Sequence, residues 1–327
     1  MAIFISHTSA LEFWSSKTRF SAGPTDANGF PQTARCSRLF EASSISEETF
    51  DAFVTSGLDT FSRPLHVLVP SSKARWRKEF LRQHVHSGPL PNASFVALGK
   101  DIYVASPEMA LLQSATMMPF PALVKTAVEF CASYAVENGG ESSARGFIDC
   151  APLTTTDRIG KFLARAQGEY GTKSLRRALP YMTDGTASPM ETALYLLLCM
   201  PRSEGGYGLP KPLVNFSIEV DRRRNDTRLC ICDFYWPERK VCVEYDSDAY
   251  HSSGDEISND SSRRNTLMDH GITTVSVTKK HVMNRRETDR VAAHIAKLLG
   301  KRTRTLPDDF VQQQLRLRHL LLKMANE

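Results

Sequence analysis

Apolar and polar positions alternate most regularly in the C-terminal half of the chain. The alternation predicts three consecutive strands, at 213–220, 228–236 and 240–246. A helix is expected before them, over about 188–200. Ser188 is a favoured N-cap, Pro189 fits the first turn, and Glu191 stands three residues after the cap. After the strands the pattern predicts a helix, a strand and a helix, at about 260–270, 273–278 and 287–299. This order predicts a mixed α/β domain.

The N-terminal part has shorter apolar runs, separated by Gly, Pro and Ser. We interpret residues 1–105 as short strands with one helix around 72–84. The pattern then predicts a helical stretch, a loop and a basic helical region broken at two glycines, at about 106–135, 138–156 and 157–179. A linker is expected over 181–187. We therefore expect an α+β N-terminal domain, an α/β domain and an amphipathic C-terminal helix, at 1–181, 182–300 and 301–327.

Composition describes an ordinary globular protein and excludes collagen-like and disordered classes. Of the 327 residues, 41% are hydrophobic and 24% are charged, and a net charge of +5 is too small to identify a nucleic-acid partner. The longest apolar run, 193–200, is far shorter than the roughly 20 residues that a membrane-spanning helix needs. The N-terminus makes a poor signal peptide, so we expect a cytoplasmic protein with no membrane partner.

The seven cysteines are scattered, and no Cys-x-x-Cys pair is present. The sequence therefore predicts neither a zinc ribbon nor a thioredoxin-type site. Cys230, Cys232 and Cys242 lie inside the strand-like runs, where a reduced thiol packs as a small hydrophobic side chain. We expect buried structural thiols at these positions.

A tight turn at 237–240 would pair the second and third of these strands as a hairpin. The facing pairs would be Trp236–Val241, Tyr235–Cys242, Phe234–Val243 and Asp233–Glu244. Asp246 would project from the same face as Glu244. Carboxylates this close repel one another, and a bound Mg²⁺ ion would neutralise them and activate water for phosphodiester hydrolysis. Alternatively, the hairpin slips by one residue, or its acids are solvated or paired with arginine.

The spacing of Asp233, ten residues, Glu244 and Asp246 resembles the core of the PD-(D/E)XK nuclease superfamily. The flanking motifs resemble those of the very-short-patch (Vsr-like) repair endonucleases and their large relatives. These motifs are CDFYWPE (232–238), VCVEYD (241–246), YH (250–251), RRNxLxxxG (263–271) and TVSVT (274–278). With the SPME helix start, the likeness covers about 188–299. It implies a restriction-endonuclease-like mixed sheet flanked by helices, and Mg²⁺- or Mn²⁺-dependent hydrolysis of DNA.

The resemblance also implies roles for individual residues. Asp233 and Glu244 would ligate the metal ion, with the Tyr245 carbonyl as a third ligand and Glu191 extending the set. Glu191 equally satisfies a capping box without any metal. Asp246 stands where the superfamily commonly has a lysine that orients the attacking water. An acid there could bind a second metal ion, act as a base, or mark an inactive fold.

Basic residues and a histidine flank this core. His251 matches the family histidine and would act as a general acid or base or contact phosphate, although a surface role in a loop explains it as well. Arg263 and Arg264 lie in the first turn of the next helix, and Lys279 and Lys280 follow the last strand. All four are candidates for phosphate contacts, and all four are also typical of a solvated face.

The N-terminal two-fifths is similar to AbiEi-type antitoxin and transcriptional-regulator proteins. The motifs that carry this likeness are LHVLVP (65–70), LP (90–91) and IYVASPE (102–108). The resemblance implies a DNA-binding regulator or a toxin–antitoxin partner. Those proteins usually begin with a winged helix, for which we find no room before Ser6.

Two hypotheses follow for function. The first is a Mg²⁺-dependent DNA endonuclease that acts in defence or repair. The alternative is a catalytically inactive nuclease-fold protein that binds DNA as a regulator or resembles an antitoxin, because a fold alone does not establish activity. A leucine-rich amphipathic helix over 310–324 is expected to pack on the body or on a protein partner.

Overall fold

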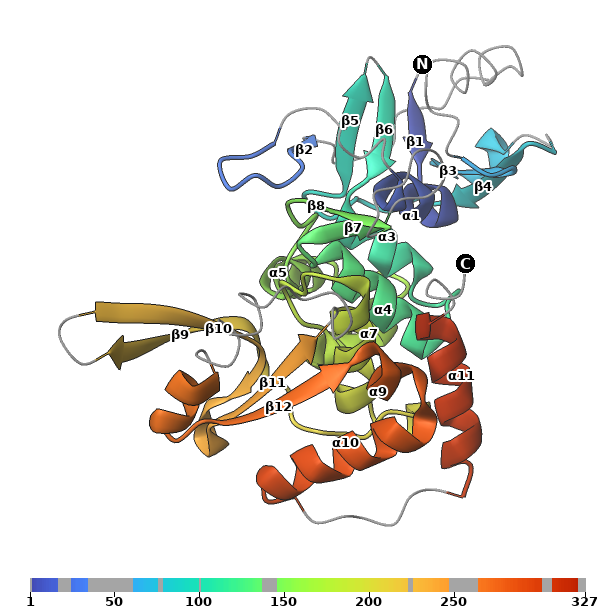
Figure 1. Ribbon diagram of the computed structural model, residues 1–327. Coiled ribbons are helices and arrows are strands. Elements are labelled where there is room, and N and C mark those ends of the chain that lie inside the picture. The colour runs from blue at the N-terminus through green and yellow to red at the C-terminus, as the bar shows by residue number, and fades with distance from the viewer. Residues whose placement is uncertain are drawn as a thin grey trace. The chain divides into compact units, whose positions relative to one another are not determined.

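Two structural units, Met1–Asp184 and Gly185–Glu327, divide the chain in the computed structural model (Figure 1). The junction lies within the segment 181–187. Both units combine helices with sheets, which confirms the α/β class. The residues that the structure describes are 2–16, 25–34, 61–75, 79–99, 101–136, 146–222, 226–246, 264–301 and 308–322.

The N-terminal unit is built on a six-stranded mixed sheet in the order β2-β5-β6-β1-β3-β4. β1 (Ile3–Ile5) pairs in parallel with β6 (Ile102–Ala105) and antiparallel with β3 (Leu65–Val69). The other strands are β2 (Thr33–Ala34), β4 (Leu81–Val85) and β5 (Phe95–Gly99). The first strand of the chain is thus an inner strand, and its residues are buried.

Helices and a small hairpin complete this unit. They are α1 (His7–Ser15), α3 (Pro107–Ser114), α4 (Phe120–Phe130), β7 (Tyr134–Val136), β8 (Phe147–Asp149), α5 (Thr156–Arg165) and α6 (Thr172–Ala178), with short 3-10 helices at Ser72–Ala74 and Leu179–Tyr181. The indole Nε1 of Trp14 in α1 donates to the Ala105 carbonyl over 2.7 Å, which fixes the helix to β6. Ser106 caps α3 and Thr155 caps α5, each through its side-chain oxygen.

One prediction for the N-terminal part is wrong, and a second is confirmed except at its end. The helix expected over 72–84 is a short 3-10 turn followed by β4, which pairs in parallel with β3. Tertiary pairing with β3 outweighs the helical preference of this segment. The helical stretch expected over about 106–135 is confirmed as two helices, α3 and α4, divided before Pro119 and Pro121, and only its end differs, because it forms the strand β7. The breaks predicted at Gly168 and Gly171 are confirmed between α5 and α6.

Three histidines lie together in the N-terminal unit. The rings of His7 and His84 stack with centroids 3.6 Å apart, and Nε2 of His84 lies 3.1 Å from Nδ1 of His66. Burial, followed by the neighbouring histidines, lowers the pKa of His7 to about 3. Burial, followed by His66, Arg82 and Arg75, lowers the pKa of His84 to about 4, and burial also lowers the pKa of His66. The folded unit therefore holds these rings neutral.

This cluster predicts acid sensitivity. The unfolded chain binds protons at histidine near the ordinary pKa of 6.5, whereas folded His84 and His7 bind them only near 4 and 3. The contribution to stability is thus complete above pH 6.5 and is lost as the pH falls towards 4 and then 3. Thermal unfolding of the full chain between pH 7 and pH 4 measures this loss. His84→Gln should flatten the profile, and an unchanged slope in that variant would contradict the assignment.

The C-terminal unit is built on a four-stranded sheet in the order β12-β11-β10-β9. β9 (Leu213–Arg222), β10 (Asp226–Trp236) and β11 (Val241–Asp246) form an antiparallel meander. β12 (Thr273–Thr278) pairs in parallel with β11 along its whole length, from Val241–Thr273 to Asp246–Thr278. All four strands lie where the apolar alternation predicts them.

Helices precede and follow this sheet. They are α7 (Pro189–Cys199), a helical segment at 264–269, α9 (Lys279–Met283), α10 (Arg285–Leu298) and α11 (Phe310–Leu322), with 3-10 helices η4 (Arg202–Glu204) and η5 (Pro237–Arg239). Figure 1 draws β11 and β12 between α7 and α10. α9 is a helix that the sequence pattern did not predict. It has its own capping box, formed by Thr278 and His281.

The tail helix α11 packs on its own unit. Phe310 and Leu317 are buried, and the buried Arg318 donates to the Val282 carbonyl over 2.5 Å and to the Thr288 hydroxyl over 3.1 Å. Burial lowers the pKa of this guanidinium, so its hydrogen bonds offset a desolvation cost. Leu315 on the same helix is exposed, and binding of a protein partner through α11 stays a prediction.

Gly205 follows η4 and lies against Gln313 of α11, and it gives a sharp stability test. Its φ is +87°, and an added Cβ would lie 2.5 Å from the Gln313 carbonyl oxygen. Gly205→Ala should therefore lower the free energy of unfolding by roughly 2–5 kcal/mol, from backbone strain and a clash together. Gly185→Ala is the matched control, because its φ is +75° with nothing within 4 Å. The control should lose only about 1–2 kcal/mol in urea unfolding. Equal losses would contradict the close contact.

Candidate functional site

The acidic hairpin forms with the predicted register. Trp236 pairs with Val241, Tyr235 with Cys242 and Phe234 with Val243. The turn is η5, and Lys240 closes it with a φ of +49°. The alternative of a one-residue slip is therefore wrong. The ladder ends at Phe234–Val243, so Asp233 and Glu244 do not form the next pair.

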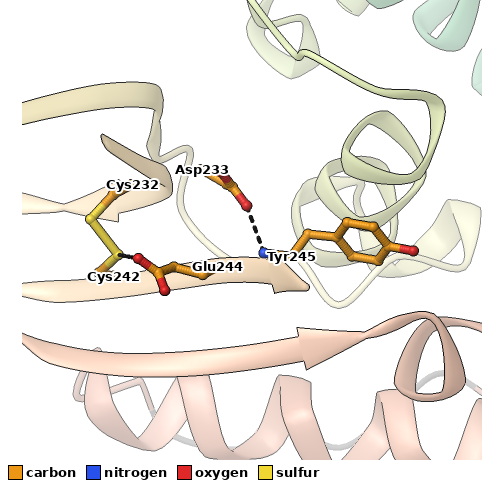
Figure 2. Close-up of a disulfide and its surroundings, with 5 residues drawn as sticks. All are labelled: Cys232, Asp233, Cys242, Glu244 and Tyr245. Atoms are coloured by element: carbon orange, nitrogen blue, oxygen red, sulfur yellow. Dashed lines mark hydrogen bonds between the residues drawn. A yellow bond between two sulfur atoms is a disulfide. The ribbon is translucent and has the colours of Figure 1, made fainter. Parts of the chain in front are cut away.

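Asp233 and Glu244 instead make separate contacts at the end of this ladder (Figure 2). Asp233 Oδ2 accepts the backbone N–H of Tyr245 over 2.6 Å. Glu244 is only 5% exposed, and its Oε1 lies 3.9 Å from Cys242 Sγ. The Asp233 carboxylate thus meets the Glu244–Tyr245 segment through the main chain, while the Glu244 carboxylate lies towards the cysteine pair (Figure 2).

Cys232 and Cys242 form a disulfide beside these acids. The expectation of reduced structural thiols is wrong for this pair, and it is confirmed for Cys230, which is free and buried. Cys242 pairs with Tyr235 in the ladder, and Cys232 lies beyond the end of the ladder at Phe234 with its Cα atom 5.9 Å from that of Cys242, a separation that suits a disulfide. Both cysteines are fully buried in an apolar cluster that includes Val220 and Leu267.

The possible metal ligands near the hairpin form one compact group. Among the described residues, Cys232, Cys242 and Glu244 are the one set of three or more Cys, His, Asp or Glu side chains whose ligand atoms all lie within 4.8 Å of one another. Asp233 and Asp246 do not belong to this set. In the described part of the chain, the three hairpin acids therefore do not converge on one point.

Asp246 lies at the carboxyl end of β11 and faces a cation. Its Oδ2 is 3.8 Å from Nη2 of Arg264, and both side chains are about one-third exposed. Nε of Arg264 is buried without a hydrogen-bond partner among the described residues. Asp246 also pairs with Thr278, directly before the exposed Lys279 and Lys280 of α9. An acid and three basic residues thus gather where β11 and β12 end.

Glu191 is held in the cap of α7. Its backbone N–H donates to Ser188 Oγ, its Oε1 accepts from the Ser188 hydroxyl over 3.0 Å, and its Oε2 accepts from the Ala187 N–H over 2.8 Å. The Nδ2 group of Asn215 reaches the same carboxylate over 3.1 Å and the Gly185 carbonyl over 2.7 Å. Asn215 has a φ of +46° on β9, a conformation that Asn tolerates better than most residues. The capping alternative thus accounts for both carboxylate oxygens of Glu191.

A pair of substitutions at Glu191 separates the cap from metal binding. Glu191→Ala should lower the free energy of unfolding by about 1 kcal/mol, because the carboxylate half of the capping box at the start of α7 is lost. Glu191→Gln keeps hydrogen-bonding groups that a capping box accepts and should retain most of this stability. It should also retain the Mg²⁺-dependent cleavage of DNA that the resemblance to PD-(D/E)XK nucleases implies. Cleavage lost in Glu191→Gln, with stability unchanged, would make Glu191 a metal ligand.

Other candidate residues are placed less completely. His251 and Arg263 lie outside the described residues.

Sequence reasoning missed Asn215 and the Cys232–Cys242 link. The signal for Asn215 was a lone amide between the apolar Val214 and Phe216 in a strand. No pattern in a single sequence pairs one cysteine with another.

Comparison with known proteins gives two relatives, both uncharacterized proteins of Mycobacterium tuberculosis, from strains CDC 1551 and H37Rv. Each is 29% identical to this chain over 143 residues, which is 44% of this chain and 48% of the relative. The chain thus spans about half the length of the curated relatives it matches. No family model matches the chain, and no solved structure matches it significantly. In the described part, no helix is both long and apolar enough to cross a membrane.

Proposed function

We propose that the C-terminal unit is a Mg²⁺-dependent DNA endonuclease that hydrolyses phosphodiesters in defence or repair. The observation that carries this proposal is the contact of Asp233 Oδ2 with the Tyr245 N–H. It brings the Asp233 carboxylate beside the segment that holds Glu244 and the Tyr245 carbonyl. These are the three oxygen ligands that the resemblance to PD-(D/E)XK nucleases implies.

The donor set suits Mg²⁺, which prefers oxygen ligands and usually takes one or two carboxylates plus water. Asp233, Glu244 and the Tyr245 carbonyl would hold the ion once the Glu244 side chain turns from Cys242 Sγ towards Asp233, and a bound Mg²⁺ would supply an activated water and neutralise charge on the phosphate. Arg264, Lys279 and Lys280, near the ends of β11 and β12, would contact flanking phosphates. His251 would contribute acid–base chemistry. The proposal also implies a cytoplasmic location, where DNA is met.

One observation favours the second candidate, a catalytically inactive DNA-binding protein with a nuclease-like fold. Asp246 occupies the position of the usual lysine and pairs with Arg264. The site would then lack the cation that orients the attacking water in the family. Its basic residues would still contact a DNA backbone.

Incubation of the full chain with supercoiled and mismatched DNA tests both candidates. Nicking with Mg²⁺ or Mn²⁺ that stops with EDTA is expected for the endonuclease. If DNA migration is retarded without cleavage in every metal condition, the endonuclease proposal fails and the catalytically inactive DNA-binding protein takes its place. If the DNA is neither cleaved nor retarded, both candidates are excluded.

A further inference from the structure

We propose that Cys232, Cys242 and Glu244 form a binding site for a thiophilic divalent metal ion such as Zn²⁺, which opens only when the disulfide is reduced. The ligand atoms of these three residues lie within 4.8 Å of one another. Both cysteines are fully buried and Glu244 is 5% exposed. Figure 2 shows the Glu244 carboxylate beside the disulfide. The site goes beyond the proposed Mg²⁺ centre because its ligand set is different.

The chemistry of the ligands selects the metal. Zn²⁺ binds both thiolates and carboxylates and can take water in the fourth position, whereas Mg²⁺ binds thiolates poorly. A disulfide sulfur carries no negative charge, so the oxidised protein offers only the Glu244 carboxylate. The oxidation state of the cysteine pair therefore decides whether the site exists.

The opening step balances with a dithiol as the reductant. Two electrons and two protons pass from the dithiol to the Cys232–Cys242 bond, giving two thiols and an oxidised dithiol. Zn²⁺ then replaces the two thiol protons, which leave to solvent. Disulfides are uncommon in the cytoplasm because such reductants are abundant there. The reduced pair is thus the form expected in the location that the proposed function implies.

The strands hold the two cysteines in place for this exchange. Their Cα atoms are 5.9 Å apart. With Zn–S bonds of about 2.3 Å, two sulfurs on a tetrahedral ion lie roughly 3.8 Å apart. That separation needs rotation of the two side chains and leaves β10 and β11 in register. The apolar cluster around the pair, which includes Tyr235 and Ile272, limits the access of bulk water and so strengthens the metal–ligand interaction.

The site shares Glu244 with the proposed Mg²⁺ centre. A Zn²⁺ ion on Glu244 would withhold this carboxylate from Mg²⁺, so thiol reduction in the presence of Zn²⁺ would inhibit cleavage. This regulatory consequence rests on the proposed function. The metal site itself does not.

Titration of the full chain with Co²⁺ tests the site without any need for activity. Reduced protein should show a thiolate-to-cobalt charge-transfer band at one equivalent of Co²⁺, and Zn²⁺ should abolish it. Oxidised protein should show none. Alkylation and mass analysis establish the state of Cys232 and Cys242 in each sample. Histidine sites elsewhere in the chain give no thiolate band and do not interfere.

Single substitutions define the ligand set. Cys232→Ser and Cys242→Ser should remove the band, and Glu244→Gln should weaken Co²⁺ binding about 10-fold or more. Cys230→Ser is the matched control, since Cys230 is buried in the same apolar cluster and does not belong to the ligand group. It should keep the band.

Three results would overturn the proposal: no band in protein with both thiols verified, a band that survives Cys232→Ser, or a disulfide that resists reduction in the folded chain. Failure of the proposed nuclease is a separate result. Protein that shows the cobalt band and never cleaves DNA keeps the thiolate site and loses the nuclease. Protein that cleaves DNA and shows no cobalt band keeps the nuclease and loses the thiolate site.

Discussion

Replacing Glu244 by Gln is expected to reduce Mg²⁺-dependent DNA cleavage by about a thousandfold or more. The substitution keeps the size and the hydrogen-bonding capacity of the side chain but removes its negative charge. A neutral amide is a poor Mg²⁺ ligand, so the ion would lose one of its two carboxylates. Because Glu244 is 5% exposed, the amide remains in the same buried environment, and cleavage rates on supercoiled DNA measure the loss.

The control for this experiment is Glu238→Gln. Glu238 lies in the η5 turn of the same hairpin, is exposed, and has the same charge as Glu244. It should cleave at the wild-type rate, and unchanged thermal unfolding should show that both variants are folded. Equal rates for wild-type protein and Glu244→Gln would remove Glu244 from the metal site, and the catalytic proposal would fail with it.

Reduction of the Cys232–Cys242 disulfide is expected to destabilise the C-terminal unit. The link closes a loop with a sequence separation of 10. On chain-entropy grounds a loop of this length contributes roughly 2–3 kcal/mol to the free energy of unfolding. For a unit of this size, we expect a fall in Tm of roughly 5–12 °C after reduction in metal-free buffer. Scanning calorimetry of oxidised and reduced full chain measures the difference.

A double variant isolates the effect of this bond. Cys232→Ser with Cys242→Ser should unfold at about the temperature of the reduced wild-type protein, and reductant should not shift it further. Zn²⁺ should restore part of the lost stability to the reduced wild-type chain and none to the double variant, because a ligand that binds only the folded state stabilises it. If reductant lowers the Tm of both proteins equally, another thiol is responsible.

Local patterns were sufficient for much of the C-terminal unit. The strands, the α7 cap at Ser188 and the pairing of Trp236 with Val241 all followed from apolar alternation, capping chemistry and a short turn. Each depends on residues close together in the sequence. Such features are readable without knowledge of the rest of the fold.

Features that depend on distant residues could not be read in this way. β4 is a strand because β3 lies beside it, and an isolated reading of 72–84 could not supply that neighbour. Asp233 meets the Tyr245 amide because the ladder with β11 stops at Phe234 and does not extend to Asp233. The disulfide and the Asn215 bridge to Glu191 likewise join separate strands and helices. The candidate residues were therefore named from sequence, while their grouping required the structure.

The parallel pairing of β11 with β12 has an evolutionary consequence. Asp246 and Thr278 face each other at the carboxyl ends of these strands, so the chain leaves both strands at the same edge of the sheet. Connecting segments accept insertions and exchanges far more readily than strands do. Under the proposed function, changes to the chain that follows these two strands would therefore alter the contacts with DNA, while the residues on the strands would continue to hold the metal ion.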